Sequence, residues 1–309
     1  MGRSPRDRDP SIFRFVTLRT VDARLWMVPS RKLEKLIGGI FARYAEITGI
    51  EIYAYCVLSN HFHMVVRSPK SNLDEFFENT DREIARRVNW KNQRLGTFFE
   101  GPYKDKKILS SQDLFDAFLY VTVNPVKHGL VEHPSEWPGF NSYQQCLTER
   151  PRTMSFTRHS IEDPAERVTH HTLRLAILPQ LKNLAASERR QYLHEAIEAR
   201  VRYWRQERRR LGRGFLGVER VKNQVPGSIP QTVTRSRMVG AYSKNAVLLR
   251  EERIRERERR LRYFEASRRY RMGEYTVEFP DYTYKPPLHR KPRSAPFQEL
   301  PGECFKQAS

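Results

Sequence analysis

The chain has 309 residues, and its 56 lysines and arginines outnumber its 36 aspartates and glutamates, for a formal net charge of +20. At roughly 100–200 residues a domain, this length predicts one or two domains. So large a positive charge is typical of proteins with a polyanionic partner, either nucleic acid or an acidic membrane surface. No apolar run approaches the roughly 20 residues of a membrane-spanning helix, so we expect no membrane span.

The three cysteines, Cys56, Cys146 and Cys304, lie far apart, and none forms a CxxC pair. This pattern argues against a disulfide framework and a cysteine zinc site, and it fits a reducing compartment. The polar residues 1–11 are not followed by an apolar stretch, so they do not resemble a secretory signal. We therefore expect a cytoplasmic, nucleoid-associated protein.

Strand-like and helix-like patterns follow one another in the first third of the chain. Alternating apolar residues and β-formers indicate strands, while apolar residues three and four apart indicate helices. The predicted elements are a strand at 12–19, a helix at 30–48, strands at 51–58 and 61–67, a helix at 72–90 and an irregular strand at 97–109. This βαββαβ order predicts an α+β fold, with a ferredoxin-like antiparallel sheet and its helices on one face.

A further helix is predicted for the segment LFDAFLYVTVN. Ser110 or Ser111 is a suitable N-cap, and Pro125 should stop the helix. Residues 125–143 contain prolines and tryptophan and close the domain, which we bound at 12–145.

Beyond this domain the chain becomes rich in arginine. Helices are predicted over 162–211 and 248–273, with a loop between them. We expect a basic, mainly helical extension at 146–273 with a DNA-binding or accessory role. The proline-rich residues 274–309 should form an extended tail, and residues 1–11 a disordered arm.

Two histidines in the predicted hairpin are candidates for a metal site. The segment SNHFHMVVRSP places His61 and His63 on either side of Phe62. Because side chains alternate between the faces of a strand, both imidazoles should point to one face and Phe62 to the other. Such a pair is more often exposed or structural than metal-binding, so a third ligand and a reactive group are needed.

The helix after the fourth predicted strand contains both. Tyr120 and Asn124 stand four residues apart and so share a helix face. Core packing is an ordinary role for a tyrosine, but Phe115, Phe118 and their apolar neighbours already supply the apolar side. Asn124 is equally consistent with a simple helix stop before Pro125.

Together these residues suit attack on a phosphodiester. Two imidazoles and an amide oxygen, from His61, His63 and Asn124, form a neutral three-point site for a divalent ion with positions open to phosphate oxygens. The hydroxyl of Tyr120, with a free pKa near ~10, is a weak nucleophile that a nearby cation activates. The product is a covalent phosphotyrosine, which conserves the bond energy for rejoining strands without ATP.

The segments CVLSNHFHMVVRSP and YVTVNPVKHGLVEHPSEWPGFNSY resemble the single-tyrosine HUH transposases, most closely their REP-associated tyrosine transposase branch. The first segment contains the His-hydrophobic-His signature. The second segment is the more specific of the two for this family. The similarity covers about residues 12–145, in order and at familiar spacing.

This resemblance implies a ferredoxin-like sheet with an appended catalytic helix, in a transposase that cleaves and rejoins single-stranded DNA. Tyr120 would be the nucleophile, leaving a 5′-phosphotyrosine and a free 3′-OH. His61 and His63 would bind Mg²⁺ or Mn²⁺, and Asn124 stands where many relatives place a glutamine as third ligand. The expected partner is single-stranded or hairpin DNA, bound by a monomer or a homodimer.

Basic residues are expected to contact phosphates, because each neutralised phosphate releases counterions. The candidates are Arg82, Arg86 and Arg87 on the second predicted helix, Lys104, Lys106 and Lys107 by the fourth strand, and Arg208, Arg209 and Arg210 in the run RQERRRLGR. In 250–271, glutamates alternate with arginines. This pattern is equally consistent with a solvated helix whose charges pair with one another and with a helix that contacts DNA. Core packing suits Trp204 better than base stacking does.

Two other functions fit parts of the sequence. A basic ferredoxin-like sheet with aromatic residues is also typical of RNA-binding modules, in which case the catalytic set would be vestigial or domesticated. No RNP-type aromatic motif is found on the predicted strands. A replication initiator or relaxase of the wider HUH class often carries a helicase, and the chain has no phosphate-loop signature.

Overall fold

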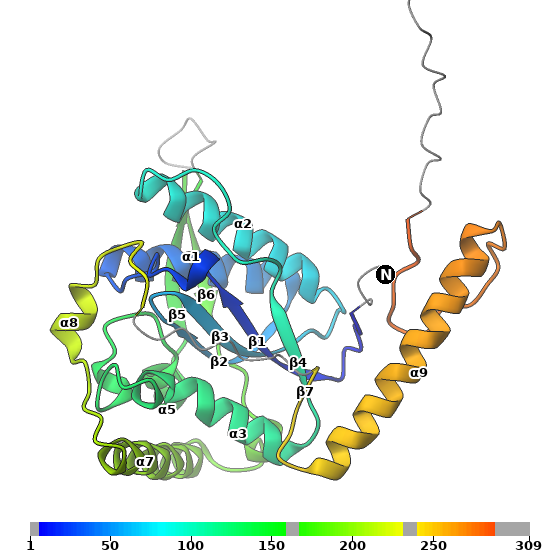
Figure 1. The fold of residues 1–309 in the computed structure, drawn as a ribbon. Helices are drawn as coiled ribbons and strands as arrows, with labels where there is room; N and C mark the ends of the chain where they lie inside the picture. Colours follow the sequence, from blue (N-terminus) through cyan, green and yellow to red (C-terminus); the bar gives the residue numbers. More distant parts are fainter. Residues whose placement is uncertain (1–5, 159–166, 231–239, 288–309) are drawn as a thin grey trace, which may run out of the picture. The chain divides into compact units, whose positions relative to one another are not determined.

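A computed structural model describes residues 6–158, 167–230 and 240–287 (Figure 1). The chain divides into two compact units, one formed by Asp7–Glu256 and the other by Met1–Arg6 with Arg257–Ser309. The first unit contains all the strands of the described residues and every residue of the candidate site. Among the described residues, no helix is both long enough and apolar enough to cross a membrane.

The first unit is built on a mixed five-stranded sheet. Its strands are β1 (Phe13–Arg19), β2 (Glu51–Val57), β3 (His61–Arg67), β4 (Lys104–Ile108) and β7 (Ala241–Tyr242). The spatial order is β2-β3-β1-β4-β7. The pairs β2/β3, β3/β1 and β1/β4 are antiparallel, and β7 is parallel to β4. The fold is therefore α+β, as the sequence predicts, and the fourth strand is shorter than the expected 97–109.

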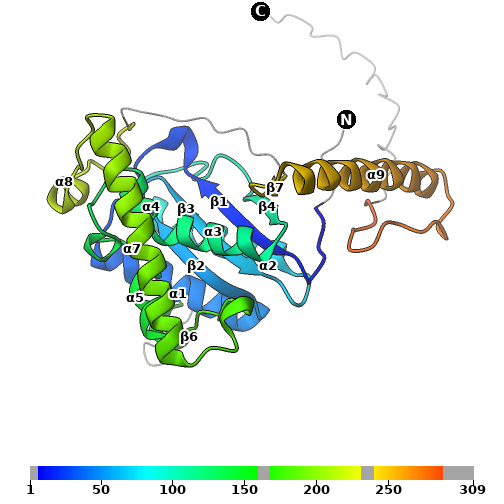
Figure 2. The same cartoon turned by 90° about the horizontal axis from the view of Figure 1, so that it is seen from below.

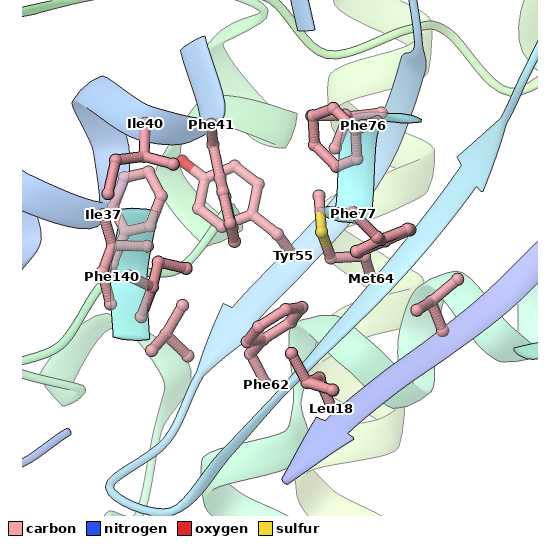
Figure 3. Close-up of a cluster of buried hydrophobic side chains, with 14 of the residues drawn as sticks. Leu18, Ile37, Ile40, Phe41, Tyr55, Phe62, Met64, Phe76, Phe77 and Phe140 are labelled. Carbon is pink, nitrogen blue, oxygen red and sulfur yellow. The ribbon is translucent and has the colours of Figure 1, made fainter. Parts of the chain in front are cut away.

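One face of the sheet is covered by α1 (Arg31–Thr48) and α2 (Leu73–Lys91). The helix α1 begins and ends as predicted, because the Ser30 side chain accepts a hydrogen bond from the Leu33 amide and Gly49 adopts a left-handed conformation. Large apolar side chains fill the space between these helices and the sheet (Figure 3), and they include Leu18, Ile37, Phe41, Tyr55, Phe62, Met64, Phe76 and Phe140. This core determines which face of the sheet stays available for a site.

The opposite face is covered by later helices (Figures 1 and 2). They are α3 (Ser111–Thr122), α4 (Asn124–Lys127), α5 (Tyr143–Thr148) and α7 (Ala186–Arg210). Leu193, Ile197 and Val201 lie four residues apart on α7 and are buried in a second hydrophobic cluster with α3 and β2. Short helices complete the unit: η1 (Val21–Ala23), η2 (Pro134–Glu136), η3 (Pro179–Leu181) and α8 (Val218–Lys222).

The region after residue 145 contains strands in addition to the helices expected there, and one of them corrects the helix predicted over 162–211. A two-stranded antiparallel sheet, β5 (Arg152–Thr157) with β6 (Val168–Leu173), packs against α1. The apolar Met154 and Phe156 alternate with exposed residues on β5, a period of two that the surrounding arginines obscure in the sequence. A Cβ on Gly39 would come within 2.1 Å of the Ser155 carbonyl oxygen, so a glycine is needed for α1 to approach β5 so closely.

The last long helix, α9 (Ala246–Arg271), begins in the first unit and ends in the second. Within the second unit, the rings of Tyr263 and Tyr270 pack against Phe279 at centroid distances of 5.6 and 5.7 Å. Cys56 and Cys146 are buried free thiols, while Cys304 lies outside the described residues. Residues 6–11 of the predicted disordered arm are described, and there Asp7 pairs with Lys107 at 2.6 Å and the Ser11 amide donates to Asp9. The predicted proline-rich tail is described as far as residue 287, and 288–309 lie outside the described residues.

Candidate active site

His61 and His63 lie on one face of β3, as strand alternation predicts. Their side chains are buried, with residue exposures of 8% and 6%, and the ring centroids are 4.7 Å apart. Phe62 points to the other face and is fully buried in the core beneath α1 and α2 (Figure 3). The hydrophobic residue of the signature therefore anchors β3, while its two histidines face α3.

Hydrogen bonds orient both rings. The Asn60 amide nitrogen donates to the Ala23 carbonyl at 2.9 Å, so its Oδ1 is the atom that meets His61 Nδ1 at 2.6 Å. His61 therefore carries its proton on Nδ1 and donates it to Asn60. His63 Nδ1 lies 2.7 Å from the hydroxyl of Thr17, its cross-strand partner on β1. Nε2 of His61 is thus left as a lone-pair donor, and Nε2 of His63 has the same role in the tautomer that donates its Nδ1 proton to Thr17. A free lone pair on Nε2 is what a metal ligand requires.

Tyr120 on α3 lies beside the histidines in the same chain. Its ring centroid is 5.5 Å from that of His63 and 5.4 Å from that of Phe15, both with edge-to-face geometry. Burial raises the pKa of Tyr120, and the side chain of Asn124 and the charge of Arg19 partly oppose that rise. The phenol is thus protonated at neutral pH and needs further charge stabilisation to act as a nucleophile.

Asn124 lies at the break between two helices. The chain leaves α3 at Thr122, two residues before the predicted end, and α4 begins at Asn124 with Pro125 in its first turn. Asn124 is fully buried, and among the described residues neither its Oδ1 nor its Nδ2 makes a hydrogen bond of good geometry. Its side chain is nevertheless near enough to the Tyr120 hydroxyl to lower the pKa of that phenol. A buried amide with incomplete hydrogen bonding is costly, so this side chain has the capacity to bind a further group beside Tyr120.

The donor set fits a divalent cation. Burial lowers the pKa of His61 to about 3, helped by the charges of His128 and Arg19, and burial lowers the pKa of His63 well below its usual value. Both rings are therefore neutral at pH 7, the state that binds metals. Within the described ranges no group of three or more His, Cys, Asp or Glu residues can hold a metal, so a third ligand has to be of another type, such as the Asn124 amide.

Sequence reasoning missed two residues of this site. Lys127 places its ammonium 4.1 Å from the ring centroid of Tyr120 and 5.3 Å from that of Trp204. The ring of His128 lies 5.9 Å from that of His61. Burial lowers the pKa of Lys127 to about 8, and the charges of Arg200 and Lys106 add to this effect. Crowding by neighbouring atoms and the nearby cations Lys127, Arg19 and Arg208 lower the pKa of His128, although this residue is exposed to solvent. The spacing of seven residues between Tyr120 and Lys127, two helical turns, was the available signal.

The three lysines of β4 have different surroundings. Lys104 and Lys106 are cross-strand partners of Thr17 and Phe15, so they share the face of the sheet that holds the histidines. Lys107 instead pairs with three carboxylates, those of Asp7 at 2.6 Å, Glu252 at 2.8 Å and Glu256 at 3.2 Å. Of the three, Lys104 is the exposed one.

The arginines of α2 lie on the opposite face of the sheet from Tyr120. Arg82 donates to Asn79, and Arg86 pairs with Glu83 at 2.9 Å on the exposed surface. Arg87 is mostly buried, where it pairs with Glu83 at 2.7 Å and donates to the Thr157 carbonyl. A DNA contact by these residues stays a prediction, and it would involve a surface distinct from the histidines.

The arginines at the end of α7 are closer to the site. Arg208 donates to the Gly214 carbonyl, lies 5.1 Å from the ring centroid of Phe215, and contributes to the lowered pKa of His128. Arg209 is exposed, and Arg210 pairs with Glu207 at 3.0 Å. Trp204 packs, partly buried, against the second hydrophobic cluster, in agreement with its predicted core role.

No family model matches the chain. In sequence, the chain is 31% identical over 88 residues to the REP-associated tyrosine transposase of Escherichia coli (strain K12), a match that covers 28% of this chain and 52% of that protein. The chain therefore spans about half the length of this curated relative. A solved structure of a REP-associated tyrosine transposase bound to a REP hairpin is similar with a TM-score of 0.40 and 22% sequence identity, covering 48% of this chain and 86% of that one.

Proposed function

We propose that this chain, which is related to the REP-associated tyrosine transposases, binds hairpin DNA and cleaves and rejoins its single-stranded flank through Tyr120. The E. coli relative is named as such a transposase, and the similar solved structure contains a REP hairpin. The strand order β2-β3-β1-β4, with α1 and α2 on one face, supports a ferredoxin-like scaffold for this chemistry.

In the proposed reaction, the phenolic oxygen of Tyr120 attacks a backbone phosphorus atom. A bond forms between that oxygen and phosphorus, the bond from phosphorus to the 3′ oxygen breaks, and the 3′ oxygen leaves as a hydroxyl after gaining a proton. The phenolic proton passes to solvent or a nearby base. The reverse reaction, with a different 3′-OH, joins strands without ATP because the phosphotyrosine conserves the bond energy.

His61, His63 and Asn124 are the residues that would hold Mg²⁺ or Mn²⁺. Bound there, the ion would neutralise charge on the phosphate and lower the barrier to attack. The chain's own contribution is to keep both imidazoles neutral and oriented through Asn60 and Thr17. The three ligands lie in one chain with Tyr120, so a monomer has the complete set, although a homodimer remains compatible with the proposal.

The observation that carries this proposal is the position of Tyr120, 5.5 Å in ring-centroid distance from His63 and on the same face of the sheet. The test incubates the full chain with a labelled DNA hairpin that has single-stranded flanks, in Mn²⁺ or in EDTA. A covalent protein–DNA adduct on a denaturing gel is expected in Mn²⁺ alone. The variant Tyr120→Phe should lose the adduct and keep DNA binding, and His61→Ala should also lose the adduct.

The outcome that contradicts the proposal is equally clear. An adduct that persists in Tyr120→Phe would exclude Tyr120 as the nucleophile. If the wild-type chain binds hairpins tightly and forms no adduct with any of them, the protein is a non-catalytic or domesticated DNA-binding protein on the same fold. Hairpins taken from inverted repeats that flank the coding region are the first substrates to use.

A further inference from the structure

Two lysines, Lys106 and Lys127, come together beside Tyr120 from different elements. Lys127 ends the short helix α4 and holds its ammonium 4.1 Å from the Tyr120 ring centroid, with Trp204 of α7 on a further side at 5.3 Å. Lys106 on β4 is the cross-strand partner of Phe15, whose ring contacts Tyr120. Both lysine side chains are partly buried rather than extended into solvent.

Within the described part of the chain, neither of these ammonium groups has an ion pair or a hydrogen bond, in contrast to their neighbours. Lys107 has three carboxylate partners, and Arg200, which also lies near Lys127, pairs with Asp116 at 2.7 Å. Burial lowers the pKa of Lys127 and that of Lys106, and the charges of Arg200 and Lys106 lower the pKa of Lys127 further. Partly buried cations that repel one another lower the stability of the fold unless an anion joins them.

The position of these two lysines indicates which anion they would bind. The aromatic rings of Tyr120 and Trp204 hold the Lys127 ammonium in place through cation–π contacts, so the charge is directed rather than mobile. A phosphodiester next to the Tyr120 hydroxyl would lie beside the Lys127 ammonium, and Lys106 is close enough to Lys127 for its charge to affect the pKa of that lysine. Lysine is a common point-charge partner of phosphate.

We propose that Lys106 and Lys127 bind the backbone phosphate that lies next to Tyr120, as a cationic site separate from the histidines. This inference rests on the proposed function and adds two phosphate-binding residues to it, of which Lys127 has no counterpart among the sequence-predicted contacts. The lysine pair stabilises the negative charge of the phosphate and fixes the position of the strand relative to the phenol. It accounts for two partly buried charges to which the described residues supply no anionic partner.

The test measures how DNA binding depends on salt. The probe is a fluorescent oligothymidylate of about 20 nucleotides, a length that covers the site of a single small domain. Binding to the full chain is followed by anisotropy in the Tyr120→Phe background, so that cleavage does not interfere. The variants are Lys127→Gln and Lys106→Met, with Lys127→Arg as the charge-conserving variant. Lys35→Met, on the exposed face of α1 across the sheet, is the matched control.

Each lost phosphate contact should reduce the slope of log affinity against log salt by about 0.7 for a single strand. We expect that reduction for Lys127→Gln and for Lys106→Met, and an unchanged slope for Lys127→Arg and Lys35→Met. Unchanged slopes in both neutral variants, with melting temperatures near that of the parent, would overturn the proposal. A misfolded Lys127→Gln protein would leave Lys106→Met and Lys127→Arg as the deciding pair.

This measurement does not depend on the covalent chemistry. If the wild-type chain forms no tyrosine adduct, the proposed function fails while the salt slopes still report on the lysine pair. If adducts form and the slopes are unaffected, the lysine pair fails while the proposed function stands. A methylphosphonate oligothymidylate, which has no backbone charge, should bind weakly and equally to parent and variants, so the effect is assigned to phosphate.

Discussion

At the scale of single residues, the site depends on polar atoms held in an apolar environment. His61 donates its Nδ1 proton to Asn60, and His63 is hydrogen-bonded through Nδ1 to the hydroxyl of Thr17, which is able to accept that proton. When the proton is on Nδ1, the Nε2 atom of each ring has a free lone pair and can bind a metal without losing a proton. Asn124 adds a buried amide that the described protein atoms do not satisfy. Outer-shell partners of this kind usually contribute strongly to metal affinity.

The first prediction concerns Thr17. Replacing it by valine removes the hydroxyl at His63 Nδ1 and frees the ring to rotate or change tautomer. We expect Thr17→Val to weaken Mn²⁺ binding about 10–100-fold, measured by calorimetry or by metal-dependent stabilisation of the fold. The matched control is Thr153→Val, an exposed threonine on β5. Equal Mn²⁺ affinity in the two variants would show that Thr17 does not orient the ligand.

At the scale of elements, particular residues determine how α1 packs on β5 and how α3 packs on α7. Gly38 and Gly39 of α1 both face β5, yet their neighbours differ. A Cβ on Gly38 would meet the flexible end of Met154 and come within 3.2 Å of the Phe140 ring, whereas a Cβ on Gly39 would meet the backbone of Ser155. Helix α3 is tied to α7 through Asp116, which pairs with Arg200 at 2.7 Å and with Lys244 at 2.7 Å.

The second prediction compares the two glycines. Gly39→Ala should lower the free energy of unfolding by about 1–3 kcal/mol, because the β5 backbone has to move. Alanine returns about 1 kcal/mol in helix propensity at either position. Gly38→Ala should therefore be close to neutral, since the Met154 side chain can shift. Urea unfolding of both variants tests this order, and a larger loss for Gly38→Ala would contradict the packing of α1 on β5.

The third prediction concerns Asp116 and pH. Burial raises the pKa of its carboxyl, but Lys244 and Arg200 outweigh burial and lower the pKa overall. A lowered carboxyl pKa stabilises the fold above the unfolded value of roughly 3.9 and loses that stabilisation as pH falls through the lower folded value. Asp116→Asn should thus cost about 1–3 kcal/mol of unfolding free energy at pH 7.

The difference between wild type and Asp116→Asn should shrink below about pH 4, where the unfolded carboxyl is protonated. Chemical denaturation at pH 7 and pH 3.5 measures this change. The exposed pair of Glu219 and Lys222 serves as the control, and Glu219→Gln should change stability by less than about 0.5 kcal/mol at either pH. A pH-independent difference for Asp116→Asn would mean that its charge is not the stabilising feature.

At the scale of the whole molecule, one chain brings together the histidines of β3, the tyrosine of α3 and the asparagine of α4. The same chain places Lys127 at the tyrosine and Lys106 opposite Phe15, whose ring contacts the tyrosine. Arginines of α2 face away from this set, across the sheet. The excess positive charge is thus distributed over more than one surface, and only part of it belongs to the candidate active site.

The fourth prediction tests whether the complete set acts within one chain. Mixing Tyr120→Phe with His61→Ala should give no covalent DNA adduct, because each chain lacks one part of its own site. Restored adduct formation, at up to a quarter of the wild-type yield for a randomly mixed dimer, would show that the tyrosine of one chain serves the histidines of another. Size-exclusion chromatography with light scattering, with and without hairpin DNA, defines the oligomeric state for this comparison.

The sequence by itself determined the α+β class, the caps of α1, the strand that carries His61 and His63 and the sides to which their rings point. These properties depend on local periodicity and on turn and cap chemistry, which a short segment specifies alone. The break between α3 and α4 was misjudged by two residues, because proline in a first helical turn and proline as a stop look alike in sequence.

Only the tertiary structure decided which charges gather at Tyr120 and which are paired elsewhere. Lys106 and Lys107 are adjacent in sequence, yet strand alternation and the approach of three carboxylates give them opposite surroundings. The helix prediction over 162–211 also failed at β6, where pairing with β5 and packing on α1 override an arginine-rich composition. Contacts between residues far apart along the chain depend on how the elements pack, and no local pattern encodes them.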